Sequence, residues 1–243
     1  MATLDPYGVL GRVAYRKGSV TSSVMAFSVI ARCPRTKLIG AACCAVGMAG
    51  GARIVHCAVG IGAVVTQARS DPRLGARGMA LLAAGLDAQA TIDALVASTP
   101  HAQWRQIAVL DAAGNTAAFS GPRVESAMSE APAQDMCAIG CGLTSALVPP
   151  AMLRVVLADP TLPLAERLML ALEEGQAAGG SEVPPQSALL RVMAGADLPL
   201  VDLRVDCDPA PVATLRTLWD RYAPIAGEIM LRSTDPENPA IRF

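Results

Sequence analysis

The sequence predicts an α+β fold, because runs of strands are followed by runs of helices instead of alternating with them one by one. Among its 243 residues, 52% are hydrophobic and only 3% are aromatic. A chain of this length can bury a sizeable core, and here the core must be built from small and aliphatic side chains. We expect one domain over residues 25–230, an N-terminal extension over residues 1–24 and a C-terminal tail over residues 231–243.

The strands are predicted from β-branched and small apolar residues, which suit a pleated, half-buried surface. Gly60 and Gly62 are expected to mark a bulge or a close backbone approach within one long strand, and Gly114-Asn115 is a hairpin signal. The predicted strands are residues 26–32 and 37–46 as a hairpin, about 52–67, two within 106–121, then 186–194 and 199–206. A short strand is also expected near residues 12–15, and residues 122–149 are expected to be irregular until the segment CAIGCGL.

The helices are predicted from capping residues and apolar spacing. Asp71, followed by proline, is expected to begin a helix that ends near Gly85. Asp87 is expected to begin a second helix, which Pro100 ends. Later helices are expected at residues 150–158, 164–177 and 209–222.

Composition excludes several classes of partner. The formal net charge is −1, from 20 basic and 21 acidic residues, which gives no electrostatic footprint for nucleic acid. Apolar runs are much shorter than the roughly 20 residues of a membrane span, and residues 1–24 lack the apolar region of a secretory signal. We therefore expect a cytoplasmic protein that binds a small molecule or forms a homo-oligomer. The seven cysteines have neither metal-ligand nor disulfide spacing, so no metal or cofactor is predicted.

The segment TQARSDPRLGARG, residues 66–78, is the first candidate site. Backbone N–H groups at a helix start, together with guanidinium groups, can converge on an anion such as a carboxylate. The candidate residues are Gln67, Arg69, Asp71, Arg73 and Arg77. The alternative is that Asp71 only caps the helix and that the arginines are solvated or paired with nearby acids.

The second candidate is the Gly-rich segment CAIGCGLTS, residues 137–145. Such a turn can present backbone N–H groups to an oxyanion, or it can be a plain connection. The chain has only two histidines, His56 in an apolar run and His101 in a predicted loop. Because it also lacks HExxH, GxSxG and Walker motifs, Ser-His-Asp and zinc hydrolase chemistry are weak hypotheses.

Several long motifs together resemble the bacterial and archaeal family known as domain of unknown function 1028. They are AFSVIAR, GIGAVVTQARSDPRLGARGMALLAAGLDAQATIDAL, RQIAVLDAAGNTAAFSG, ALEEGQAAGG with QSALL, and VDLRVD followed by PVATLRTLW. This resemblance implies the fold of the N-terminal nucleophile (Ntn) hydrolases, a four-layer αββα sandwich. In those enzymes a Thr, Ser or Cys that begins a strand attacks a carbonyl, and its own freed α-amino group acts as the base.

The chain departs from the family pattern at two positions. The family strand usually begins Met-Thr-Phe-Ser, but here residue 26 is alanine; relatives usually have asparagine where Cys141 stands. Ala26 is consistent with an engineered inactive form, with natural divergence in which Ser28, Cys43 or Cys44 takes over, or with a family that never used the N-terminal nucleophile. If residues 1–24 remain attached, the nitrogen of residue 26 is an amide and cannot act as a base.

The leading hypothesis is hydrolysis of a C–N bond in a small carboxylate-bearing molecule, by an amidohydrolase or a deaminase of a 2-aminomuconate-type enamine acid. The alternatives are a non-catalytic small-molecule binder that has lost the nucleophile, or a purely structural homo-oligomer. The catalytic candidates are Ala26 as the family's nucleophile position, Ser28, Asp71 and Cys141. The substrate-binding candidates are Arg32, Gln67, Arg69, Arg73, Arg77, Gly140 and Glu182, with Glu182 also considered as an acid-base group.

Overall fold

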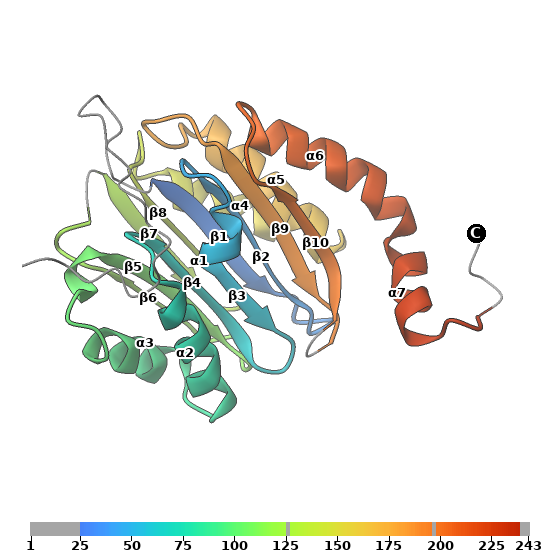
Figure 1. Ribbon diagram of the computed structural model, residues 1–243, viewed down its shortest axis with the longest axis horizontal. Helices are drawn as coiled ribbons and strands as arrows, with labels where there is room; N and C mark the ends of the chain where they lie inside the picture. Colours follow the sequence, from blue (N-terminus) through green and yellow to red (C-terminus); the bar gives the residue numbers. More distant parts are fainter. Residues whose placement is uncertain (1–24, 125–126, 196–197, 239–243) are drawn as a thin grey trace, which may run out of the picture.

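Two antiparallel sheets pack face to face in the computed structural model, which describes residues 25–124, 127–195 and 198–238. One sheet has the strand order β10-β9-β2-β1-β8-β7, and the other has the order β3-β4-β5-β6. Helices cover the outer face of each sheet (Figure 1). The predicted α+β class and the four-layer αββα order are therefore confirmed.

Strand β1 (Ala26–Arg32) lies in the middle of the six-stranded sheet. It pairs on one side with β2 (Ile39–Ala45), as the predicted hairpin requires, and on the other with β8 (Met136–Cys141). Strands β9 (Ser187–Met193) and β10 (Pro199–Val205) extend the sheet beyond β2. The predicted positions of both strands are confirmed.

The predicted long strand over residues 52–67 is wrong, because it is a short helix followed by a hairpin. Helix α1 (Gly51–Ile54) leads into β3 (Val55–Ala58), which turns back into β4 (Gly62–Ala68). Gly60 and Gly62 have φ values of +77° and +145°, so the chain reverses direction there instead of forming a bulge. The alternative of a close backbone approach holds at Gly62, where a Cβ would lie 2.2 Å from the Leu110 carbonyl oxygen. Strands β5 (Arg105–Asp111) and β6 (Thr116–Ser120) complete this sheet as the predicted hairpin.

Strand β7 (Met128–Ala133) falls in the segment that was expected to be irregular. It is an edge strand that pairs only with β8, and its residues alternate between exposed and half-buried. Its sequence, MSEAPA, contains no β-branched residue and includes a proline. Edge strands tolerate both features, which is why residue types gave no strand signal.

The helices form the two outer layers. Helices α2 (Pro72–Ala83) and α3 (Ala88–Ala97) pack on the four-stranded sheet, capped by Asp71 and Asp87 as predicted. Helices α4 (Val148–Ala158), α5 (Leu164–Ala177) and α6 (Pro211–Tyr222) pack on the six-stranded sheet. Helix α7 (Ala226–Thr234) follows α6 beyond the β10 edge and crosses the expected boundary between residues 230 and 231 (Figure 1).

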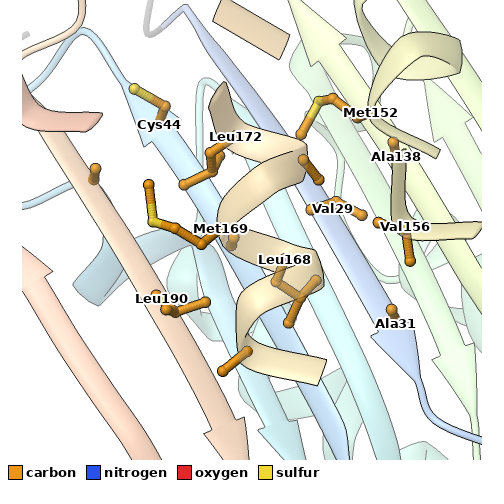
Figure 2. Packing of buried hydrophobic residues seen from close by; sticks show 14 of the residues in the cluster. Val29, Ala31, Cys44, Ala138, Met152, Val156, Leu168, Met169, Leu172 and Leu190 are labelled. Atoms are coloured by element: carbon orange, nitrogen blue, oxygen red, sulfur yellow. The ribbon is translucent and has the colours of Figure 1, made fainter. Parts of the chain in front are cut away.

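The core is layered in the same way as the fold. Figure 2 shows Leu168, Met169 and Leu172 of α5 packed over the strands of the six-stranded sheet, close to Val29 of β1 and Leu190 of β9. Between the sheets, the buried side chains are mostly small, as the low aromatic content predicts. Small residues let the two sheets approach closely, so a polar group placed between them is cut off from solvent.

The remaining predictions of organisation have mixed outcomes. Residues 1–24, with the expected extension and short strand, lie outside the described residues. None of the helices in the described part of the chain has the length and hydropathy needed to cross a bilayer. Within the same residues, all seven cysteines are free and no group of His, Cys, Asp and Glu is arranged to hold a metal ion.

Candidate functional site

Residue 26 begins the central strand and faces the space between the two sheets. Ala26 is 0% exposed and lies between Ala45 of β2 and Cys141 of β8. Its neighbour Met25 is also buried, and the Met25 carbonyl accepts a hydrogen bond from the Val46 N–H at 2.9 Å. While the Met25–Ala26 peptide bond is intact, the nitrogen of Ala26 is an amide, and the methyl side chain of Ala26 offers no nucleophile.

A chain of buried polar side chains connects residue 26 to the opposite sheet. The Ser28 hydroxyl donates to the Gln67 Oε1 at 2.6 Å, and the Gln67 Nε2 donates to the Ala26 carbonyl at 3.1 Å and to the Gln106 Oε1 at 2.7 Å. The Gln106 Nε2 in turn donates to the Gly140 carbonyl at 3.0 Å. Ser28, Gln67 and Gln106 are each at most 1% exposed, so this network fixes the backbone of residue 26 against β4, β5 and β8.

Cys141 is paired directly with Ala26 across the neighbouring strand β8, but its environment disfavours a thiolate. Burial raises the pKa of the Cys141 thiol to about 11, and the backbone N–H groups of Ala26 and Ala68 oppose only part of that shift. A thiol that remains protonated at neutral pH is a poor nucleophile.

The turn after β8 is held against the residue that precedes Ala26. Gly142 has a φ of +65°, and a Cβ added there would lie 2.2 Å from the Met25 Cγ. The Glu182 N–H donates to the Gly142 carbonyl at 2.8 Å, which brings the exposed Glu182 to the same end of the sheet as Ala26. Gly140 contributes its carbonyl to the buried network as an acceptor for Gln106.

The predicted anion-binding turn lies at the start of α2 and surrounds a cavity of about 350 Å³. Asp71 caps the helix by accepting from the Arg73 N–H at 3.1 Å, and it also accepts from the Arg73 Nε and Nη2 at 2.9 and 2.7 Å. These Arg73 bonds outweigh partial burial and hold the pKa of Asp71 below its ordinary value, so the carboxylate stays ionised. The cavity is lined by Asp71, Arg73, Leu74, Arg77, Ser98, Thr99, Pro100 and His101.

Sequence reasoning missed two residues beside this turn. Arg105 is mostly buried, donates to the Arg69 carbonyl and lies 3.8 Å from the Asp71 carboxylate, while its Nε has no hydrogen-bond partner among the described residues. Ala68, which precedes the turn, has a φ of +65°, a conformation that costs an alanine about 1 kcal/mol. The sequence reveals neither the position of Arg105 nor the positive φ of Ala68, because both depend on how β4 and β5 pair.

The structure groups the predicted site residues into two neighbouring sets and leaves one apart. Ala26, Ser28, Gln67, Gly140 and Cys141 meet between the sheets at the start of β1, with Glu182 at the adjoining turn. Asp71, Arg73 and Arg77 surround the α2 cavity, and the Arg69 guanidinium stacks on Trp104 at 4.1 Å. Arg32 lies at the opposite end of β1, where it forms an ion pair with Asp135 at 2.6 Å.

Comparisons with known proteins give the family but no activity. A crystal structure of a protein from Silicibacter pomeroyi with the same family model is 25% identical, covers 82% of this chain and 89% of that chain, and has a TM-score of 0.76. Anbu (ancestral beta-subunit) from Yersinia bercovieri is 12% identical, covers 89% and 100% of the two chains, and has a TM-score of 0.36, too low to support an inference. None of the curated proteins compared matches the chain. The model of the family of unknown function DUF1028 matches residues 26–215, and the chain therefore belongs to that family.

Proposed function

We propose that this protein binds a small dicarboxylate at the start of α2, in an Ntn-hydrolase-like shell whose nucleophile position is vacant. The observation that carries this proposal is the cavity of about 350 Å³ that Arg73, Arg77 and His101 line at a helix N-terminus. Guanidinium groups favour carboxylate oxygens through charge-assisted hydrogen bonds, and Arg73 and Arg77 place two guanidinium groups at this cavity. The Asp71 carboxylate offsets one of these charges and holds Arg73 in place.

The start of β1 supports binding more strongly than covalent catalysis. Covalent catalysis needs a nucleophile next to a base, and Ala26 supplies neither. The Ser28 hydroxyl is buried and donates to an amide oxygen, which is not a base, and the Cys141 thiol stays protonated. These features favour a ligand-binding protein in the form that this sequence encodes.

A second candidate function is hydrolysis of the C–N bond of an enamine acid by acid-base chemistry. The observation that favours it is His101, which lines the same cavity as Asp71 and adds an imidazole, a side chain that commonly transfers protons in catalysis. Tautomerisation of an enamine to an imine needs a proton donor and a proton acceptor but no covalent nucleophile. In that scheme the ionised Asp71 would accept a proton from the enamine nitrogen, and His101 would donate a proton to the enamine carbon. Water would then add to the imine carbon, and the C–N bond would break with release of ammonia.

Binding is tested by titration calorimetry with succinate and muconate, two dicarboxylates of different length, and with neutral succinamide as the control ligand. We expect Arg77→Ala to weaken dicarboxylate binding roughly tenfold, because it removes one charge-assisted hydrogen bond. Arg204→Ala removes the same charge from β10, far from the cavity in sequence and sheet position, and should leave binding unchanged. Equal binding of dicarboxylate and succinamide, or equal losses in both variants, would contradict the proposal.

Catalysis is tested separately, by following ammonia release from enamine and amide acids and the intact mass of the protein. If the parent chain is inactive because residue 26 is alanine, the Ala26→Thr variant should lose residues 1–25 and gain amide hydrolysis, while the parent chain keeps its full mass. Ammonia release by the parent chain that disappears in His101→Gln would instead establish the acid-base route. If neither chain turns over these compounds and dicarboxylate binding is retained, only the binding function is supported.

A further inference from the structure

A second cavity, of about 460 Å³, lies at the end of β1 opposite Ala26. Three segments meet there, namely the turn from β1 to β2, the turn from β7 to β8, and the connection from α4 to α5. The cavity belongs to the size range of small-molecule sites. Its walls include Pro34, Arg35, Met136, Leu157, Pro160 and Arg167.

Arg167 is the feature that distinguishes this cavity. It projects from the first turns of α5, is only 4% exposed, and lines the cavity. Its Nε donates to the Val156 carbonyl near the end of α4 at 2.7 Å, and no described residue accepts a hydrogen bond from its two terminal amino groups, which are not fully buried. A guanidinium that lines a cavity with donors to spare favours an anion that accepts from them.

The acids around the cavity already have other partners. Asp135 accepts from Arg32 at 2.6 Å. Asp159 is half-buried and accepts from the Thr161 N–H and hydroxyl at 2.9 and 2.6 Å. These hydrogen bonds, with a smaller contribution from the charge of Arg167, hold the pKa of Asp159 below its ordinary value. Arg35 adds a second positive charge at the rim. The cavity thus combines two arginines with the apolar surface of Pro34, Met136, Leu157 and Pro160, and the one acid in its lining, Asp135, is paired with Arg32.

We propose that this cavity is a second ligand site, which takes a small monocarboxylate with a short apolar body. The fork of the Arg167 guanidinium matches the two oxygens of one carboxylate, and Arg35 supplements it from the rim. Pro34, Met136 and Pro160 offer apolar surface for a few carbon atoms. The ligand therefore differs in chemistry from the dicarboxylate proposed for the α2 cavity, where polar groups dominate the lining.

The first test is calorimetric titration with butyrate, with neutral butyramide as the matched ligand. Butyrate should bind and butyramide should not, and Arg35→Ala should weaken butyrate binding several-fold. Arg167→Met should weaken butyrate binding roughly tenfold to a hundredfold, as expected for the loss of a charge-assisted pair. Arg77→Ala, which weakens succinate binding if the proposed function is correct, should leave butyrate binding unchanged, so the two proposals fail independently.

A second test needs no substitution of the buried arginine, because Cys33 lines the same cavity. Burial raises the pKa of the Cys33 thiol, but hydrogen bonds from the Thr36 side chain and from the backbone of Thr36 and Arg35 outweigh this and lower it. Iodoacetate carries a carboxylate and iodoacetamide does not. With either reagent the thiolate sulfur attacks the methylene carbon, a C–S bond forms, and the C–I bond breaks to release iodide.

The two alkylation rates are measured by peptide mass spectrometry at Cys33 and at the exposed Cys207, which serves as the internal reference. The ratio of the iodoacetate rate to the iodoacetamide rate should be roughly tenfold higher at Cys33, and butyrate should abolish this preference saturably. Equal ratios at the two cysteines, or a preference that butyrate does not affect, would overturn the proposal. A Cys33 that reacts with neither reagent while Cys207 reacts fully would also overturn it, because the cavity would then be closed to such ligands.

Discussion

Replacing Gln67 with leucine tests whether the buried polar network holds the start of β1. Gln67 is 0% exposed and serves as the hub of the network, with one hydrogen bond accepted and two donated. Leucine fills a similar volume but has no polar atom. The substitution leaves the Ser28 hydroxyl without its acceptor and the Gln106 Oε1 without its donor, and it also removes the Gln67 donor from the Ala26 carbonyl.

The expected loss in the free energy of unfolding follows from these two orphaned groups. A buried polar group that loses its partner costs roughly 1–3 kcal/mol, so two cost roughly 2–6 kcal/mol. Ser28→Ala in the Gln67→Leu background removes one of the orphans and should recover about 1–3 kcal/mol. This coupling separates a lost hydrogen-bond partner from poor packing of the leucine, which Ser28→Ala would not relieve.

The measurement is urea denaturation followed by circular dichroism, for the two single variants and the double variant. Thr66→Val is the matched control on the same strand, because the Thr66 hydroxyl is buried and has no hydrogen-bond partner among the described residues. Removing it should leave stability unchanged or raise it by up to about 1 kcal/mol. A Gln67→Leu loss below about 1 kcal/mol, or losses that simply add in the double variant, would refute the reasoning.

Two further predictions concern the helices. Burial raises the pKa of Glu166, but hydrogen bonds, chiefly from Arg216, lower it below 4.5 overall, so this group stabilises the fold above that pH and the effect is lost on acidification. Arg216→Met should therefore lower the melting temperature at pH 7 and make it less sensitive to pH below 4.5. Gly75→Ala should destabilise by about 1–3 kcal/mol, because the new Cβ would lie 2.1 Å from the His56 Cδ2, whereas Gly227→Ala meets open space in α7 and should stabilise by about 0.5–1 kcal/mol. Melting temperatures measured by calorimetry would contradict the packing argument if both alanine variants shifted in the same direction.

Local chemistry made much of the fold predictable. Asp71 and Asp87 each precede an apolar helical pattern, and each caps its helix through its own carboxylate. By contrast, the turn between β3 and β4 depends on the positive φ of Gly60, and a sequence cannot distinguish that conformation from a bulge. Strand β7 was missed because an edge strand needs only one partner and one buried face, which leaves little pattern in its residues.

The candidate site was predictable only in part, for a different physical reason. Position 26 could be identified through the resemblance, and Gln67 was selected as part of a motif. Gln106 was not selected, although a glutamine at the start of an apolar strand could have indicated a buried polar contact. Its role depends on β5 facing β1 across the space between the sheets, which is a property of sheet packing and not of local sequence.

Met25 determines which of the two neighbouring sets can bind a ligand in the intact chain. Its carbonyl accepts a hydrogen bond from the Val46 N–H, and its side chain covers the backbone of Gly142. Both backbone segments lie beside Ala26, so a ligand could reach them only after Met25 had been removed. The α2 cavity has no such obstruction, since Met25 is not among the residues that line it. Dicarboxylate binding measured on the intact chain therefore reports on the α2 cavity, and any additional dicarboxylate binding in a protein that begins at residue 26 reports on the start of β1.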